Sequence, residues 1–244
     1  METPTPYGQS EGMVAILDAL GAASYSPDEI SQFLEARASV LQSFDAKSEE
    51  SKYIPKTSLS TFTFNDTVLI ACDLGHFPSL REVKSFFVLI RKLIVDSLDN
   101  KILFRGSIGI GSFYIDRPTS TILGQAVTDA AAWYDKADWF GIHATPRATL
   151  IIEGLIAQAG EDTNHIAVPY KVPMKAGRSL KLVSVNWPRG FYVKGVSPCK
   201  RGEDKRAKLL SMLGALSVPP GVESKYVNSV EFFDGVKDFK IPES

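Results

Sequence analysis

The sequence predicts an α+β fold of the split βαβ type, in which helices cover one mainly antiparallel sheet. The order of the expected elements carries this prediction, because strand, helix, hairpin, helix, strand and helix follow one another between residues 13 and 137. Two apolar segments at 58–64 and 67–73 are separated by only two residues, which is typical of an antiparallel hairpin. No internal repeat or low-complexity segment interrupts the 244 residues, so one domain is the simplest organisation.

The helices of this order are expected from their start signals and their apolar stripes. Ser26 and Pro27 suit the N-cap and first position of a helix that runs to about residue 47. Pro78 and Ser79 open a second helix with a broad apolar stripe, and a third is expected over about 121–137. The expected strands are 13–18, the two of the hairpin, a glycine-containing segment at 101–115, and two more at 165–172 and 180–187.

The C-terminal part is expected to be helical, with two amphipathic stretches after residue 203. We therefore expect a main unit at 1–190 and a helical extension at 191–244 that packs on the same domain. The extension carries no motif from which a role can be predicted.

Bulk properties limit the classes of function. The formal net charge of −1 gives no electrostatic reason to expect a nucleic-acid partner or an acidic membrane surface. No apolar run has the length of a membrane span, and the first residues lack the basic and apolar regions of a signal peptide. The three histidines and two cysteines show no metal-ligand spacing, so a zinc site is not expected. We expect a cytoplasmic protein.

Two aspartates are the most informative residues. Asp18 ends the first apolar run, and Asp66 lies in the turn of the expected hairpin. Burying a carboxylate is costly unless it is paired, hydrogen-bonded or bound to a cation. Two carboxylates at adjacent strand ends would form an oxygen-rich site that suits Mg²⁺ or Mn²⁺. The alternative is that Asp18 merely ends a strand and Asp66 is a turn residue.

Five short motifs between residues 12 and 185 resemble, in order, those of the class III nucleotidyl cyclases. L-D-A-L-G-A at 17–22 and F-N-D-T-V-L-I-A at 64–71 resemble the two metal motifs. R-G-S-I-G-I-G at 105–111 resembles the glycine strand, L-G-Q-A-V-T-D-A-A-A-W at 123–133 the following helix, and M-K-A-G-R-S-L-K-L-V-S-V at 174–185 the late strand with a phosphate-binding lysine. The resemblance implies a cyclase-like core and attack of the ribose 3′-hydroxyl of a nucleoside triphosphate on its α-phosphorus.

The resemblance also implies a ligand set and a partner. Asp18 and Asp66 would hold two Mn²⁺ or Mg²⁺ ions per site, and the active sites would lie at the interface of a homodimer. Ala19, Leu20, Gly21 and Ala22 would lie near the β- and γ-phosphates, where small residues permit close approach. Lys175, or Lys171 in a shifted alignment, would contact the terminal phosphates as a point charge. A solvent-exposed strand lysine is the alternative.

Two residues depart from the family at the transition state. Thr128 stands where the family has an asparagine, and Ala132 where it has an arginine. Thr128 can still donate a hydrogen bond, whereas Ala132 cannot stabilise a pentavalent phosphorus. Lys136, expected one helical turn beyond Ala132, and Arg105 are the candidates to replace the missing groups. A solvated Lys136 and a structural Arg105 are the alternatives.

Phe62 and Thr121 stand where purine cyclases read the base. A phenyl ring can stack on a base or narrow a pocket but cannot read a purine edge; a core-facing strand residue is the alternative. This pattern and V-N-W-P at 185–188 resemble the Pycsar cyclases, which make cyclic UMP or cyclic CMP in bacterial antiphage defence. We therefore expect a pyrimidine nucleotide cyclase that acts on UTP or CTP. The alternatives are an adenylate or guanylate cyclase, a catalytically silent nucleotide-binding or dimerisation module and, last, another two-metal nucleotidyl transferase such as a cyclic-dinucleotide synthase.

Overall fold

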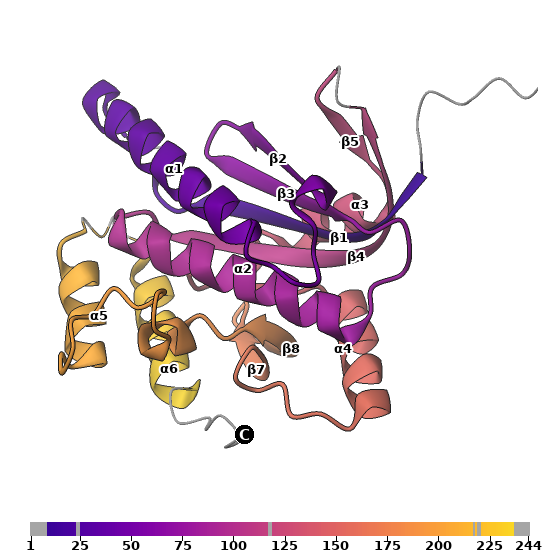
Figure 1. Cartoon of the computed structure of the whole chain (residues 1–244). Coiled ribbons are helices and arrows are strands. Elements are labelled where there is room, and N and C mark those ends of the chain that lie inside the picture. The colour runs from indigo at the N-terminus through magenta and orange to yellow at the C-terminus, as the bar shows by residue number, and fades with distance from the viewer. Residues whose placement is uncertain (1–8, 23–24, 117–118, 217, 219–220, 237–244) are drawn as a thin grey trace, which may run out of the picture.

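A mixed eight-stranded sheet organises the chain in the computed structural model, which describes residues 9–22, 25–116, 119–216, 218 and 221–236 (Figure 1). The strand order is β2-β3-β1-β4-β6-β8-β7, with β5 paired to β4, and only the β4–β6 pairing is parallel. The strands are β1 (Gln9–Ala19), β2 (Leu59–Phe64), β3 (Thr67–Asp73), β4 (Phe104–Asp116), β5 (Thr121–Leu123), β6 (Gly141–Ala144), β7 (Ala167–Pro173) and β8 (Ser179–Val185). The α+β prediction with a mainly antiparallel sheet is confirmed.

Helices α1 and α2 begin where the sequence signals predict. They are α1 (Pro27–Ser48), α2 (Leu80–Asp99), α3 (Gln125–Trp133), α4 (Pro146–Ala159), α5 (Lys205–Gly214) and α6 (Glu223–Val236), with short 3₁₀ turns at η2 (Lys56–Ser58) and η3 (Pro188–Tyr192). Helices α1 and α2 each begin with a capping box, in which Ser26 pairs with Glu29 and Ser79 with Glu82. Among the described residues, no helix is both long and apolar enough to cross a membrane.

Two sequence predictions need correction. The helix expected over 121–137 is shorter, because 121–123 form β5 and Gly124, with φ of 136°, separates this strand from α3. The prediction also omitted β6 and α4, which lie between the third expected helix and β7. Strand β6 has only four residues and all of them are buried, so it shows no alternation of buried and exposed side chains.

The two faces of the sheet carry different helices. Met13, Ala15 and Leu17 of β1 belong to the larger core with α1, α2 and α4, whereas Val14 and Ile16 pack with α3 on the opposite face. Because side chains alternate along a strand, Asp18 falls on the α3 face. Arg105 of β4 lies directly opposite Asp18, so its side chain is on the same face.

The C-terminal helix α6 is part of the main core. Phe232 and Phe233 of α6 are fully buried and lie against the indole rings of Trp139 and Trp187. The hydroxyl of Ser229 accepts a hydrogen bond from the backbone amide of Phe140 at 2.8 Å. These contacts fix α6 beside the turn that follows α3.

Candidate active site

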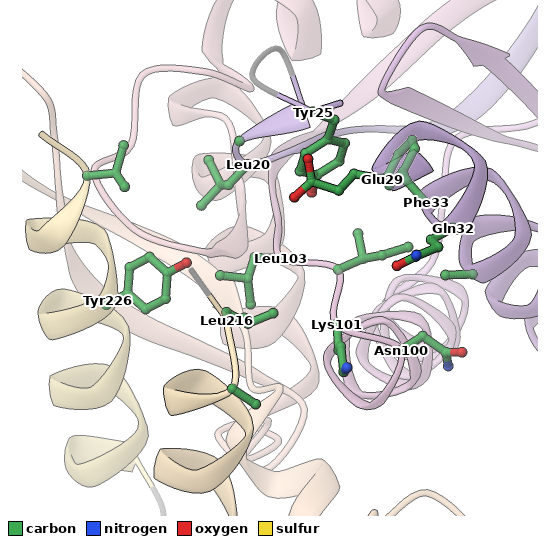
Figure 2. Close-up of a pocket in the computed structure, with 15 residues that line it drawn as sticks. Leu20, Tyr25, Glu29, Gln32, Phe33, Asn100, Lys101, Leu103, Leu216 and Tyr226 are labelled. Carbon is green, nitrogen blue, oxygen red and sulfur yellow. The ribbon is translucent and has the colours of Figure 1, made fainter. Parts of the chain in front are cut away.

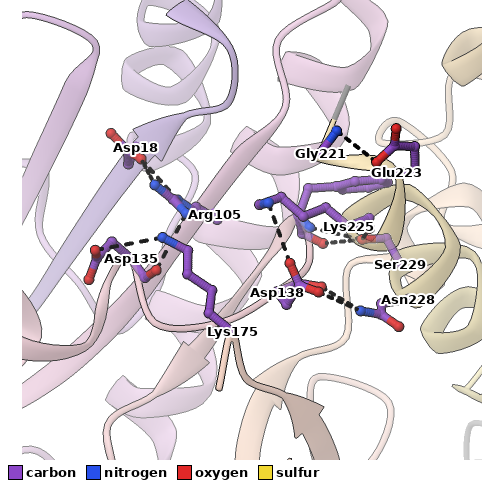
Figure 3. A network of polar contacts seen from close by, with 11 residues as sticks. Asp18, Arg105, Asp135, Asp138, Lys175, Gly221, Glu223, Lys225, Asn228 and Ser229 are labelled. Carbon is purple, nitrogen blue, oxygen red and sulfur yellow. Dashed lines mark hydrogen bonds and ion pairs between the residues drawn. The ribbon is translucent and has the colours of Figure 1, made fainter. Parts of the chain in front are cut away.

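An ion pair between Asp18 and Arg105 forms the centre of the candidate site (Figure 3). Asp18 lies directly opposite Arg105 in the β1–β4 ladder, and Arg105 Nε and Nη2 donate to Asp18 Oδ2 at 2.9 and 2.8 Å. Both side chains are 14% exposed. Burial raises the pKa of Asp18, the hydrogen bond and charge of Arg105 oppose this, and the carboxylates of Asp66 and Asp135 raise it further. Asp18 therefore lies close to one cationic group, Arg105, and to two carboxylates.

The β2–β3 hairpin brings Asp66 close to Asp18, at the end of the neighbouring strand β1. Its turn residue Asn65 has φ of 51°, a left-handed conformation that asparagine tolerates well. The backbone amide of Ala19 donates to the carbonyl oxygen of Asp66 at 3.2 Å, which ties the hairpin to the end of β1. The Asp66 carboxylate is close enough to raise the pKa of Asp18. Asp18, near the end of β1, and Asp66, in the β2–β3 turn, thus lie close together.

The donor set of Asp18 and Asp66 fits a hard divalent cation. Two neighbouring carboxylates repel each other, and a cation between them removes this repulsion. The described residues contain no group of three or more acidic, histidine or cysteine side chains suited to a metal. Mg²⁺ in nucleotide sites is commonly held by one or two carboxylates and takes its other ligands from phosphates and water. The residues therefore fit a metal that arrives with a phosphorylated substrate, and Arg105 competes with it for Asp18.

Lys175 joins this cluster from the turn between β7 and β8. Its backbone amide donates to the carbonyl oxygen of Lys136 at 2.9 Å, and its Nζ lies 3.8 Å from Asp135 Oδ2. Partial burial and the charge of Arg105 lower the pKa of Lys175, while Asp135 opposes them. Arg105 and Lys175 are therefore two neighbouring cations, of which Arg105 is paired with Asp18 and Lys175 lies near Asp135.

Lys136 lies in a different position from the one expected. Helix α3 ends at Trp133, so Lys136 belongs to the following turn and does not continue the face of Thr128 and Ala132. Its Nζ lies 3.1 Å from Asp135 Oδ1, and its side chain is mostly exposed. Thr128 and Ala132 are themselves exposed on α3.

The other lysine and the two candidate base-reading residues lie outside the charged cluster. Lys171 is exposed on β7, opposite Lys181, and makes no ion pair among the described residues. Phe62 is half-buried on β2, on the same sheet face as Asp18, and lines a cavity of about 470 Å³ to which Ser120 contributes. Thr121, in β5, is exposed, and its hydroxyl oxygen accepts a hydrogen bond from Thr119.

The predicted phosphate segment divides between the sheet and a cavity. Ala19 is buried in the larger core, and Ala22 packs against that core. Leu20 and Gly21 line a cavity of about 350 Å³ between the β1–α1 turn, the α2–β4 turn and the C-terminal helices (Figure 2). The hydroxyl of Tyr226 points into this cavity, whereas Asp18 and Asp66 do not line it.

The sequence prediction missed three charged residues of the site. Asp135 and Asp138 lie in the turn after α3, and Lys225 reaches the same region from α6 (Figure 3). Lys225 is only 7% exposed; its Nζ lies 3.4 Å from Asp138 Oδ1, and its charge contributes to lowering the pKa of Lys175. The segment D-K-A-D at 135–138 was a visible signal for the acidic residues, whereas nothing near Lys225 indicated its position.

Comparison with known proteins places this geometry in a known fold. No protein-family model and no curated protein matches the sequence. The catalytic core of a rhodopsin-guanylyl cyclase with converted specificity, crystallised with ATPαS, matches the structure with a TM-score of 0.50 and 13% identity, covering 74% of this chain and 98% of that one. The chain has the class III nucleotidyl cyclase fold.

A second solved structure is also similar to the chain. The adenylyl cyclase CyaB from P. aeruginosa matches with a TM-score of 0.48 and 11% identity, covering 73% of this chain and 95% of that one. A structural match at 13% sequence identity shows the fold alone, and the chemistry has to be argued from the residues of this chain. The match to the guanylyl cyclase core confirms the fold that the sequence motifs implied.

Proposed function

We propose that the protein is a class III nucleotidyl cyclase, which converts a nucleoside triphosphate to its 3′,5′-cyclic monophosphate and pyrophosphate. The observation that carries this proposal is that Asp18 and Asp66 lie at the same end of neighbouring strands of a cyclase-fold sheet. Arg105 forms an ion pair with Asp18, and Lys175 lies near Arg105 and Asp135. Paired carboxylates and adjacent cations are the groups that phosphoryl transfer requires.

Each of these residues has a defined role in the proposal. Asp18 and Asp66 would hold Mn²⁺ or Mg²⁺, two ions per site, which lower the pKa of the ribose hydroxyl and neutralise triphosphate charge when bound. Arg105 and Lys175 would bind phosphate oxygens, Arg105 through its fork and Lys175 as a point charge. In the structure, Arg105 donates to the Asp18 oxygen that the metal would bind. Arg105 would therefore leave Asp18 and bind the phosphate of the substrate when the metal is present.

The proposal includes a homodimer with active sites at the interface. Phe64 is 76% exposed beside the Asp66 turn and lies across from Thr67, on the sheet face of Asp18. Thr128 and Ala132 are exposed on α3, the helix that covers part of that face. A second copy of the chain would bury these side chains and bring Thr128 toward bound phosphate, where its hydroxyl can donate.

We further propose that the substrate is a pyrimidine nucleotide, UTP or CTP, as in the cyclases of antiphage defence. Phe62 offers an aromatic face and no hydrogen-bonding group, so it favours stacking over recognition of a purine edge. Thr121 is small and exposed, so it adds no purine-specific acid or amide.

Incubation of the protein with ATP, GTP, UTP or CTP and Mn²⁺, followed by mass spectrometry of the products, tests the substrate class. Cyclic UMP or cyclic CMP as the main product is expected. Clean conversion of ATP or GTP with neither pyrimidine product would replace this assignment by an adenylate or guanylate cyclase.

A catalytically silent nucleotide-binding or dimerisation module is the second candidate. The alanine at position 132 favours it, because a methyl group gives a transition state no electrostatic help. Binding of all triphosphates by calorimetry with no cyclic product from any of them would support this candidate over the enzyme.

A further inference from the structure

Arg91 of α2 is a buried cation without an acidic partner among the described residues. It is 6% exposed, its Nη1 donates to the carbonyl oxygen of His165 at 3.0 Å, and its Nε has no hydrogen-bond partner. Burial and the charge of Arg189 lower the pKa of Arg91 to about 10. A buried guanidinium normally has a carboxylate beside it, because desolvating an unpaired charge is costly.

Two further cationic or basic groups face the same region from other elements. Arg189 lies in η3, whose backbone packs on Arg91: a Cβ placed on Gly190 would lie 3.5 Å from Arg91 Cγ. The Nε of Arg189 and the Nδ1 of His165 are also buried without a partner. The charges of Arg91 and Arg189 both act on His165. Three buried nitrogens from three segments therefore lack hydrogen-bond partners in one place.

The neighbouring acidic groups do not neutralise this cluster. Asp162 is exposed, and its Oδ1 accepts the backbone amide of Asn164 at 2.9 Å. Glu161 pairs with Lys84 at 2.5 Å. Neither carboxylate forms an ion pair with Arg91, Arg189 or His165, so the described surroundings leave an excess of positive charge.

We propose that Arg91, Arg189 and His165 form a binding site for a tetrahedral oxyanion of the phosphate class, separate from the candidate active site. A guanidinium presents a planar fork of donors that matches two oxygens of such an anion, and the imidazole of His165 adds a third donor. An anion would supply the acceptors that the three buried nitrogens lack.

The position of the cluster separates it from the catalytic residues. His165 precedes β7 and Arg189 follows β8, whereas Lys175 lies in the turn that joins the opposite ends of these strands. Strands of this length hold their ends about 20 Å apart. The proposed site therefore does not depend on the cyclase activity and can be occupied at the same time as the active site.

Phosphate-dependent thermal unfolding and calorimetry of the full chain test the proposal, with chloride at equal ionic strength as the reference. Inorganic phosphate and pyrophosphate are titrated in parallel, since a preference for pyrophosphate would point to the product of the proposed reaction. Both titrations use the Lys175→Ala background to remove a phosphate contact of the candidate active site. We expect binding, and a dissociation constant at least about tenfold higher when Arg189→Ala is added.

Two further variants keep the result interpretable. Arg201→Ala removes an exposed arginine outside the cluster, equal in charge to Arg189, and is expected to leave the affinity unchanged. Arg91→Lys keeps the charge but loses the fork, and is expected to weaken binding while retaining the circular dichroism of the folded chain. Absence of phosphate binding in the Lys175→Ala background, or equal affinity with and without Arg189→Ala, would overturn the proposal.

Discussion

Replacement of Arg105 by methionine tests the electrostatics of the candidate site through protein stability. The substitution keeps an apolar stem and removes the guanidinium that donates twice to Asp18 Oδ2. It leaves Asp18 as a mostly buried carboxylate next to Asp66 and Asp135, the two groups that already raise its pKa.

The expected loss follows from the exposure of the pair. Removing one partner of a fully buried ion pair destabilises a protein by about 3–5 kcal/mol. Because Asp18 and Arg105 are each 14% exposed, some hydration remains and we expect a loss of about 2–4 kcal/mol at pH 7. Arg178→Met, at an exposed arginine with no ion pair among the described residues, is the control, and should change stability by less than about 0.5 kcal/mol.

The loss is expected to depend on pH with a defined sign. The folded-state pKa of Asp18 is already above 3.8, and without Arg105 it rises further, because the group that opposes the rise is gone. A carboxyl whose pKa is raised by folding takes up a proton in the folded state first, so stability is regained as pH falls through that pKa.

Urea unfolding followed by circular dichroism between pH 7 and pH 4 measures both effects. The deficit of Arg105→Met should be largest at pH 7 and shrink toward pH 4. A deficit equal to that of Arg178→Met, or one that is constant over this range, would refute the ion-pair account.

Three other variants test the remaining assignments. Lys175→Ala should raise the KM for the triphosphate about tenfold in a turnover assay, because Lys175 lies in the charged cluster. Lys171→Ala, outside that cluster, should change the KM less than twofold. Equal effects would contradict the assignment of Lys175 as the phosphate-binding lysine. Gly109→Ala should lower the free energy of unfolding by about 1–3 kcal/mol, because its Cβ would lie 2.3 Å from the carbonyl oxygen of Ala126. In the same urea titration, Gly154→Ala on the open side of α4 should be neutral or stabilising. Phe64→Asp should weaken self-association in analytical ultracentrifugation without loss of helix content, and an unchanged oligomeric state would argue against the proposed interface.

The fold was predictable where local chemistry is strong. Serine N-caps followed three residues later by glutamate set the starts of α1 and α2, and the two-residue turn at 65–66 set the hairpin. The short strand β6 depends on pairing with β4 and β8, and such non-local contacts leave little local signal. Helix α4 was missed although the sequence carries its start and end signals: Thr145 is its N-cap, and Gly160 ends it in a left-handed conformation.

The candidate site was predictable as a set of residue types, and much less so as a geometry. The motifs indicated Asp18, Asp66 and Arg105. The salt bridge between Asp18 and Arg105 depends on the β1–β4 register, which cannot be predicted from the local sequence. The contacts of Asp135 and Lys225 come from a turn and a distant helix, and depend on how α6 packs. Polar residues in such connections carry no periodic signal.

Formation of a cyclic nucleotide by the wild-type protein and by Asp66→Asn is the most direct test of the central claim. The substitution removes one carboxylate charge at a half-exposed turn, so the fold should be retained. With Mn²⁺ and UTP or CTP, mass spectrometry should detect the cyclic monophosphate from the wild type and at least about a hundredfold less from Asp66→Asn. No cyclic product from any nucleoside triphosphate, or equal product from both proteins, would contradict the two-carboxylate cyclase.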